Sequence, residues 1–378
     1  MINVFRPFIP SLYLETSASK RIARRRVFCL LCFAFLVMLS CSKKLPSDPC
    51  CAFGELPAGS DAEDGQGYLQ VEGSTSAYYY VLDAAGQQVT YQSLNKGVAL
   101  NPGHYRIVVN NSAHSIEVLE GKLAKCSTGT LILTGNTSEY YYVIDSTNQQ
   151  LGYEALSRSM SFFPGKFKVR VNNTELITEV KLKELTEIRT GTILVRGMTN
   201  EYYYVVDKAN NQLNYNSLEK PLAFLSGSYE VKVNNTSRKA EVLAGRVTEL
   251  VTGNLLVNGL TDEYYYVTDT AGNALNYQSL NKPLAFFPGT FQIKVNNTIM
   301  KGRVTAGQTA EFMTGSVRLT GGGTGYYYVL DETGNQLNYN SLNKSLSFFP
   351  SQYTIKLGSS TRKATITAGQ LTSINAFN

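Results

Sequence analysis

The hydrophobic pattern of the chain is that of short β-strands, and it is clearest in the second half of the sequence. Residues 255–259 form a short apolar stretch, residues 263–269 are aromatic and β-branched, and residues 291–295 alternate apolar with polar side chains. Such runs are typical of strands, and no stretch has the 3.6-residue period of a helix. The pattern predicts an all-β fold with five to seven short antiparallel strands in about 60 residues.

Self-similarity dominates the chain after residue 66. Three consecutive tyrosines recur every 62 residues, beginning at Tyr78, Tyr140, Tyr202, Tyr264 and Tyr326. A single tyrosine recurs with the same period at Tyr91, Tyr153, Tyr215, Tyr277 and Tyr339. This fixed period predicts a tandem array of five small β-sandwich modules at residues 67–128, 129–190, 191–252, 253–314 and 315–378. Because no linker separates the copies, we expect a rod-like array, with a five-bladed β-propeller as the alternative.

Recurrent turn residues support this division. An Asp follows each tyrosine triplet, and the third residue after it is Gly or Asn, as in Asp207 and Asn210. A second hairpin is marked by paired asparagines such as Asn234-Asn235, which Gly358-Ser359 replaces in the last copy. These residues tolerate the left-handed conformation of tight turns. One Asp per copy provides no acid/base pair, so we expect it to accept backbone hydrogen bonds in its own turn.

One part of the repeat resembles a known class of module. The stretch from Pro288 to Asn297 reads Pro-Gly-x-Phe-x-x-Lys-Val-Asn-Asn, and residues 304–307 then read Val-x-Ala-Gly. This pattern resembles the second half of transthyretin-like or PEGA-like β-sandwich modules of bacterial surface proteins. The resemblance implies a structural or binding role without catalytic residues. Lys183 departs from the pattern, because the other four copies have Gly at that position.

The N-terminal segment has the features of an export signal. Residues 20–26 are strongly basic, and residues 27–40 form an apolar run that is too short to span a bilayer comfortably. Ser40 followed by Cys41 resembles the lipobox of bacterial lipoproteins, although Met38 stands where Leu is usual. The resemblance implies that residues 1–40 are removed and that Cys41 carries lipid. The alternative is an ordinary or uncleaved signal.

Residues 41–66 complete the predicted N-terminal region. After Cys41 they are rich in Pro, Ser, Gly and acidic residues, without hydrophobic periodicity, which predicts a flexible tether. Together the signal, the lipid and the tether predict an exported protein anchored to a bacterial membrane, in the periplasm or at the cell surface.

Charge and cysteines add two expectations. The chain carries a formal net charge of +6, but residues 1–40 contribute six basic groups and one acid, which leaves 29 basic and 28 acidic groups in the rest. A body with a net charge near +1 argues against a nucleic-acid partner. Cys126 aligns with apolar residues of the other copies, which favours a buried small hydrophobe; a disulfide from Cys50 or Cys51 is the alternative.

The sequence offers little chemistry for catalysis. His104 and His114 lie in the first copy and align with unrelated residues elsewhere, which is typical of surface substitutions. The glycine-rich stretch 321–325 lacks the Lys-Ser/Thr of a phosphate-binding loop. We therefore expect no enzyme, no cofactor and no metal.

The tyrosines are the remaining candidates for function. Alternate side chains of a strand face opposite sides, so we expect the middle tyrosine of each triplet in the core and the outer two on the other face. The candidate ligand-binding residues are Tyr78, Tyr80, Tyr140, Tyr142, Tyr202, Tyr204, Tyr264, Tyr266, Tyr326 and Tyr328. The leading hypothesis is a structural spacer or adhesion rod. The alternative is a carbohydrate-binding protein, with a glycan or another surface protein as partner.

Overall fold

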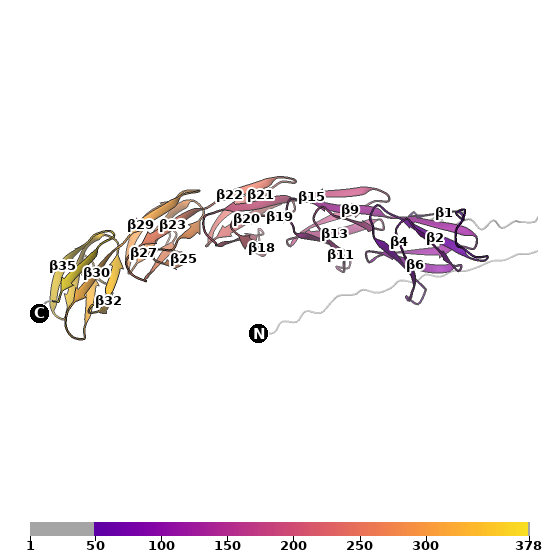
Figure 1. Cartoon of the computed structure of the whole chain (residues 1–378). Helices are drawn as coiled ribbons and strands as arrows, with labels where there is room; N and C mark the ends of the chain where they lie inside the picture. Colours follow the sequence, from indigo (N-terminus) through magenta and orange to yellow (C-terminus); the bar gives the residue numbers. More distant parts are fainter. Residues whose placement is uncertain (1–48, 377–378) are drawn as a thin grey trace, which may run out of the picture. The chain divides into compact units, whose positions relative to one another are not determined.

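The computed structural model describes residues 49–376, and within them the chain forms five groups of seven strands and no helix (Figure 1). The predicted signal peptide, Cys41 and the first part of the predicted tether lie outside the described residues. The five groups follow one another with the 62-residue period. The all-β tandem arrangement is therefore confirmed, and the described residues form no propeller.

The strands of each module have the following bounds. Ahead of the modules lies β1 (Cys51–Glu55). Module 1 contains β2 (Gly67–Glu72), β3 (Tyr78–Leu82), β4 (Gln88–Ser93), β5 (Gly97–Leu100), β6 (Gly103–Val109), β7 (Ser112–Val118) and β8 (Lys122–Ser127). Module 2 contains β9 (Gly129–Thr134), β10 (Tyr140–Ile144), β11 (Gln150–Ala155), β12 (Ser159–Phe162), β13 (Gly165–Val171), β14 (Thr174–Val180) and β15 (Leu185–Arg189). Module 3 contains β16 (Gly191–Arg196), β17 (Tyr202–Val206), β18 (Gln212–Ser217), β19 (Leu222–Phe224), β20 (Gly227–Val233), β21 (Thr236–Val242) and β22 (Val247–Val251). Module 4 contains β23 (Gly253–Asn258), β24 (Tyr264–Thr268), β25 (Ala274–Ser279), β26 (Leu284–Phe286), β27 (Gly289–Val295), β28 (Thr298–Val304) and β29 (Thr309–Met313). Module 5 contains β30 (Gly315–Thr320), β31 (Tyr326–Leu330), β32 (Gln336–Ser341), β33 (Ser345–Phe348), β34 (Ser351–Leu357), β35 (Ser360–Ile366) and β36 (Leu371–Asn375).

Each module is a sandwich of two sheets. In module 3 the four-stranded sheet has the order β18-β17-β20-β21 and is antiparallel throughout. The second sheet has the order β19-β16-β22, in which the first and last strands of the module, β16 and β22, run parallel. Because these two strands run in the same direction, the chain leaves the module at the end opposite to the one at which it entered, and the next module begins there.

The middle tyrosine of each triplet lies in the core, as its position in the strand predicts. Tyr203 has no exposed surface and packs with Val205, Val231 and Ile193. Its hydroxyl donates to the carbonyl oxygen of Lys220 at 2.7 Å, which gives the buried polar end a partner. Burial raises the pKa of Tyr203 well above its usual range. The same arrangement recurs at Tyr79, Tyr141, Tyr265 and Tyr327.

The turns have the geometry that their residues favour. Asn234 and Asn235, between β20 and β21, have φ values of 45° and 61°, so both lie in the left-handed region that a tight two-residue hairpin requires. After β17, the Oδ1 atom of Asp207 accepts hydrogen bonds from the backbone nitrogens of Ala209 at 2.9 Å and Asn211 at 2.8 Å. The recurrent Asp therefore caps its own turn, as expected.

The strand β1 corrects two expectations. Residues 51–55, predicted to be tether, pair antiparallel with β8 at the edge of the second sheet of module 1. Cys51 forms a disulfide with Cys126, which the repeat had favoured as a lone apolar residue. Cys126 is fully buried, so the prediction of its burial holds while the disulfide alternative is the one observed. Cross-strand pairing of Cys51 with Cys126 brings the two sulfurs together.

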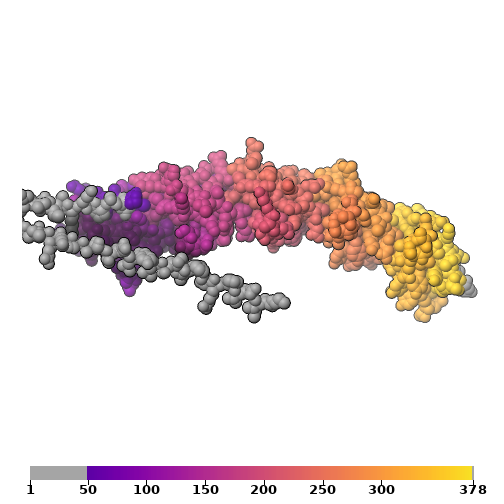
Figure 2. Space-filling model, turned by 180° about the vertical axis from the view of Figure 1, so that it is seen from behind, coloured from indigo at the N-terminus to yellow at the C-terminus, as the bar shows by residue number. Residues whose placement is uncertain are grey.

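Neighbouring modules share core residues. Phe287, which belongs to module 4, is almost fully buried and packs in the core of module 3. Phe163, Leu225 and Phe349 make the equivalent contribution to modules 1, 2 and 4. Each of these modules therefore completes its hydrophobic core with a side chain of the next. The space-filling view of Figure 2 shows the modules following one another in the order of the sequence colours. Such sharing stabilises small repeats that bury too little surface alone.

Hydrogen bonds from the paired asparagines reinforce the contact between modules. The side-chain amide of Asn234 donates to the carbonyl oxygen of Ala285 at 2.9 Å and to the carboxylate of Glu201. Glu201 in turn accepts from the backbone nitrogen of Ala285 at 2.6 Å. The amide of Asn235 donates to the carbonyl oxygen of Leu275 at 2.7 Å. The asparagines thus form the turn with their backbone and hold the next module with their side chains.

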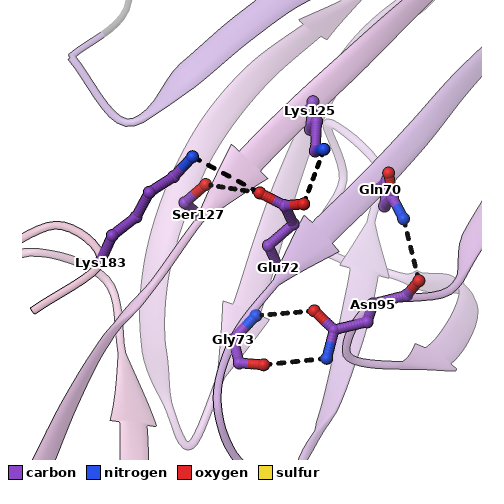
Figure 3. Close-up of polar contacts among 7 residues, drawn as sticks. All are labelled: Gln70, Glu72, Gly73, Asn95, Lys125, Ser127 and Lys183. Atoms are coloured by element: carbon purple, nitrogen blue, oxygen red, sulfur yellow. Dashed lines mark hydrogen bonds and ion pairs between the residues drawn. The ribbon is translucent and has the colours of Figure 1, made fainter. Parts of the chain in front are cut away.

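The contact between modules 1 and 2 contains an additional ion pair (Figure 3). The carboxylate of Glu72 on β2 has one oxygen 2.6 Å from Nζ of Lys125 on β8 and the other 3.5 Å from Nζ of Lys183 in module 2. Beside it, the amide of Asn95 clamps the backbone of Gly73 through bonds of 3.1 and 2.8 Å. Lys183 therefore reaches back from a position that is Gly in the other copies.

Candidate functional site

Three tyrosine rings lie together on the outer face of each four-stranded sheet. In module 3, Tyr202 and Tyr204 flank the buried Tyr203 on β17, and Tyr215 is the cross-strand partner of Tyr204 on β18. Tyr202 is 50% exposed, Tyr204 38% and Tyr215 52%. The exposed fractions place the outer tyrosines on the surface rather than in the core. We call these three rings and their equivalents the tyrosine clusters.

The geometry of the cluster is nearly the same in every module. The ring centroids of Tyr202 and Tyr215 lie 5.8 Å apart at 64°, and those of Tyr204 and Tyr215 lie 5.7 Å apart at 28°. Ring contacts with this geometry are favourable, so the three tyrosines of a cluster stabilise one another's positions on the surface. The five clusters consist of Tyr78, Tyr80 and Tyr91; Tyr140, Tyr142 and Tyr153; Tyr202, Tyr204 and Tyr215; Tyr264, Tyr266 and Tyr277; and Tyr326, Tyr328 and Tyr339.

The sequence-based prediction of ligand-binding residues does not include Tyr215 and its equivalents, which form the central ring of each cluster. Tyr215 and its equivalents recur with the same period as the triplets, so the repeat itself carried the signal. Their face could not be assigned from the sequence, because the hairpin between the two strands contains a register shift after Val205. Only the strand pairing shows that Tyr204 and Tyr215 lie side by side.

A shallow groove lies beside the second outer tyrosine, where one module meets the next. Between modules 2 and 3 it has a volume of about 380 Å³ and is lined by Tyr142, Arg170, Asn173, Leu213 and Asn214 among others. A groove of about 380 Å³ occupies the equivalent place between modules 3 and 4, and one of about 360 Å³ lies between modules 1 and 2. The groove therefore recurs with the repeat.

A cation accompanies the tyrosine in four of the five modules. Arg170 on β13 pairs across the sheet with Tyr142, and its guanidinium lies 5.4 Å from the centre of that ring. The equivalent residues are Lys232, Lys294 and Lys356, whereas module 1 has Val108. Each of these three grooves thus combines an aromatic ring with planar amides, and the grooves after modules 2 and 3 add a positive charge from Arg170 and Lys232.

The histidines are not brought together. His104 and His114 lie on the neighbouring strands β6 and β7, but His104 pairs with Glu117 and His114 pairs with Ile107. His114 packs near Phe163 of module 2, with ring centroids 5.2 Å apart. Within residues 49–376 there is no cluster of His, Cys, Asp and Glu suited to a metal ion.

The recurrent Asp is a structural group. Hydrogen bonds from Asn211 lower the pKa of Asp207, and the side chain lies at the surface. A carboxylate held ionised by the backbone of its own turn is suited to fixing that turn rather than to proton transfer.

Comparison with known proteins gives only weak similarities. No protein-family model and no curated protein matches the chain. Among solved structures, the Bacillus anthracis TIE protein is 12% identical, with 87% of this chain and 71% of that chain covered and a TM-score of 0.17. The pilus adhesin SpaC of Lactobacillus rhamnosus GG, in its open conformation, is 10% identical over 82% of this chain and 43% of that chain, with a TM-score of 0.17. BcpA, the major pilin subunit of Bacillus cereus, is 10% identical over 82% and 98%, with a TM-score of 0.13. Scores this low carry no argument about function.

Within the described part of the chain, no helix has the length and apolar character needed to cross a bilayer.

Proposed function

We propose that the chain is a non-catalytic, exported surface protein whose modules serve as a spacer and whose tyrosine clusters serve as repeated adhesion sites. The observation that carries the proposal is the tyrosine cluster, which places three large rings at the same surface position in all five modules; thirteen of the fifteen rings are exposed, and Tyr142 and Tyr328 are half-buried. Tyrosine offers a flat apolar ring and a hydroxyl, and it is enriched in protein interfaces.

Repetition of a weak binding site increases the overall affinity of the chain for a surface. When several equivalent sites on one chain contact a surface, each binding event after the first is intramolecular, so overall affinity exceeds that of one site by orders of magnitude. Fifteen rings in five equivalent clusters suit such multivalent contact.

The test removes the clusters one module at a time. Beads coated with the chain are scored for retention on a panel of cell surfaces, with Tyr202, Tyr204 and Tyr215 replaced by Ser first and the equivalent residues of other modules added in turn. We expect retention to fall steeply, and more than in proportion to the number of clusters lost. Replacement of Ile177 and Ile299, exposed apolar residues outside the clusters, is the control. Equal retention with all five clusters removed would refute the adhesive role.

A second candidate function, carbohydrate binding, is favoured by the groove beside each cluster. Tyr142 provides a ring on which a sugar can stack, and Asn173 and Arg170 place polar groups within the same groove of about 380 Å³. This predicts that Tyr202→Ala with Tyr204→Ala weakens retention on a glycan array while the thermal unfolding curve stays unchanged. Unchanged glycan retention would leave only the protein-adhesion hypothesis.

The proposal includes anchoring through a lipid on Cys41. The support is the basic and apolar leader followed by Ser40-Cys41. In cells fed an alkyne-tagged fatty acid, we expect the chain to be labelled and the Cys41→Ser variant to be unlabelled and released from the membrane fraction. Labelling that survives the substitution would exclude this anchor.

A further inference from the structure

The second sheet of each module ends in a strand whose outer edge is covered only in module 1. There the sheet order is β1-β8-β2-β5, so β8 has a neighbour on both sides. In modules 2 to 5 the corresponding sheets have three strands, and β15, β22, β29 and β36 form their edges within the described residues. Module 1 therefore shows, within the same molecule, how this edge looks when a strand occupies it.

Burial differs between the covered and the uncovered edges. Cys126 is fully buried in module 1, whereas its equivalents Ile188, Leu250 and Phe312 on β15, β22 and β29 are only half-buried. In module 5 the equivalent Ile374 is buried although no strand of the described residues covers β36, so the difference is confined to modules 2 to 4. Leu123 is half-buried beside β1, whereas the equivalent Leu185 and Val247 are 62% and 53% exposed. Apolar side chains on both faces of these edges are left partly in contact with water.

The backbone of the edge strand is available for pairing in the same register. In module 1, the backbone N–H of Ser127 donates outward to the carbonyl oxygen of Cys50, in the segment that leads into β1. The backbone N–H of the next residue, Thr128, donates inward to the carbonyl oxygen of Glu72 on β2. The backbone N–H of Thr314, the equivalent of Thr128 in module 4, likewise donates inward to the carbonyl oxygen of Asn258. Because alternate residues of a strand face opposite neighbours, the backbone groups of Met313 and Glu311 face the uncovered edge.

The charge at the edge points to the chemistry of the partner. Ala52 of β1 lies opposite Lys125 of β8. The equivalents of Lys125 in modules 2, 3 and 4 are Glu187, Glu249 and Glu311. Glu187 pairs with Arg189 and Glu249 with Arg196 of the same module at the surface, and an incoming cation would add to or compete with these exposed pairs. An incoming strand would therefore present a basic residue at the position of Ala52, since opposite charges directly across a strand pair are stabilising. The same glutamates disfavour edge-to-edge pairing of two copies, because like charges would face each other.

We propose that β15, β22 and β29 accept an extended segment of another polypeptide, which adds antiparallel as β1 does. The segment carries apolar residues at the positions of Cys51 and Phe53, where they cover the half-buried residues, and Lys or Arg between them. Strand addition of this kind takes its affinity from backbone hydrogen bonds and its specificity from alternate side chains. The surface lies outside the tyrosine clusters, so the proposal is independent of the function proposed above.

The test uses the full chain and a synthetic peptide. The peptide has the sequence of residues 49–57 with Cys50→Ser, Cys51→Val and Ala52→Lys, and a fluorescent label. We expect saturable binding by fluorescence anisotropy, weakened about tenfold when the lysine of the peptide is replaced by Glu. Absence of saturable binding at millimolar concentration would overturn the proposal, and so would equal binding of the two peptides.

Variants of the chain locate the binding site. Proline in place of Glu187, Glu249 and Glu311 removes an outward N–H from each edge without touching the inner ladder, and we expect loss of peptide binding with the thermal unfolding curve retained. Lysine at the same three positions keeps the backbone and is expected to reverse the preference toward the Glu peptide. Binding unaffected by either triple variant contradicts the proposal. So does concentration-dependent dimerisation in sedimentation that competes with the peptide, because the occupant would then be a second copy.

Discussion

Lys183 departs from the repeat and adopts a backbone conformation that is energetically unfavourable for a residue other than Gly. Its φ is 58°, in the region where Gly121, Gly245, Gly307 and Gly369 have φ between 64° and 71°. An L-residue in this region costs roughly 1–2 kcal/mol. The ion pair with Glu72 offsets little of this, because the lysine side chain is 64% exposed and such pairs contribute about 0–1 kcal/mol.

We therefore expect Lys183→Gly to raise the free energy of unfolding of module 2 by up to about 1 kcal/mol. The measurement is chemical denaturation, with hydrogen exchange in β14 and β15 as the probe of unfolding in module 2. The matched control is Gly245→Lys in module 3, where a Cβ atom would meet nothing within 4 Å, so that the backbone cost appears alone. A destabilised Lys183→Gly variant would mean that the pair with Glu72 outweighs the backbone cost.

Glu72 gives module 1 a dependence on pH. The hydrogen bond from Lys125 lowers the pKa of Glu72, with a smaller contribution from Lys183. A carboxyl group whose pKa is lower in the folded than in the unfolded state stabilises the fold above its unfolded pKa. That stabilisation is lost as the pH falls through the folded pKa. We expect Glu72→Gln to lower the Tm of module 1 at pH 7, and the difference from the parent chain to shrink toward pH 3. A difference that stays constant over this range would assign the effect to packing.

Strand alternation allowed part of the site to be predicted from the sequence. The burial of Tyr203 and the exposure of Tyr202 and Tyr204 follow from the two-residue period of one strand. The place of Tyr215 could not be predicted, because it depends on the register between two strands. The disulfide was only the less favoured alternative for a related reason: the repeat describes what the copies share, and Cys51 belongs to a strand that, among the described residues, only module 1 has.

At the scale of elements, turns and strands were predictable while sheet membership was not. Each of these hairpins lies where paired asparagines, Gly358-Ser359 in module 5, or an Asp with a following Gly or Asn stand, because these residues adopt the required turn conformations. The parallel pairing of the first and last strands, such as β16 with β22, joins residues far apart in the chain. Local patterns contain no information about such pairing.

The hairpin between β20 and β21 acts both as a turn and as a connector. We expect Asn234→Gly to keep the turn, because Gly accepts a φ of 45°, but to leave the carbonyl oxygen of Ala285 and the carboxylate of Glu201 without this donor. The loss is about 1–3 kcal/mol of contact between modules 3 and 4. Faster hydrogen exchange in β26 measures it, with exchange in β33 of module 5, which lies outside the contact between modules 3 and 4, as the internal control. Unchanged exchange in β26 would show that the shared core alone holds the modules together.

At the scale of the whole molecule, the two terminal modules differ from the inner ones where they have no neighbour among the modules. Asn101 of module 1 is exposed and stands where the later modules have the core-sharing Phe or Leu, such as Phe287. In module 5, Gly325 and Gly358-Ser359 replace the Glu and the paired asparagines of the inner contacts. The core-sharing Phe or Leu and the paired asparagines are therefore present at all four contacts and are replaced at the two ends, while the Glu is present at three contacts and is Ala77 in module 1.

This arrangement predicts that damage to one module spreads no further than its neighbour. The disulfide closes a loop across a separation of 75 residues within β1 and module 1, and loss of such a bridge costs roughly 2–4 kcal/mol. We choose Cys126→Ala, because a change at Cys51 alone would leave Cys50 beside Cys126. Hydrogen exchange should accelerate strongly in β2 to β8, slightly in module 2 through Phe163, and not in modules 3 to 5, since coupling in a linear array acts between nearest neighbours. Acceleration across all five modules would instead show that the array unfolds as a single cooperative unit.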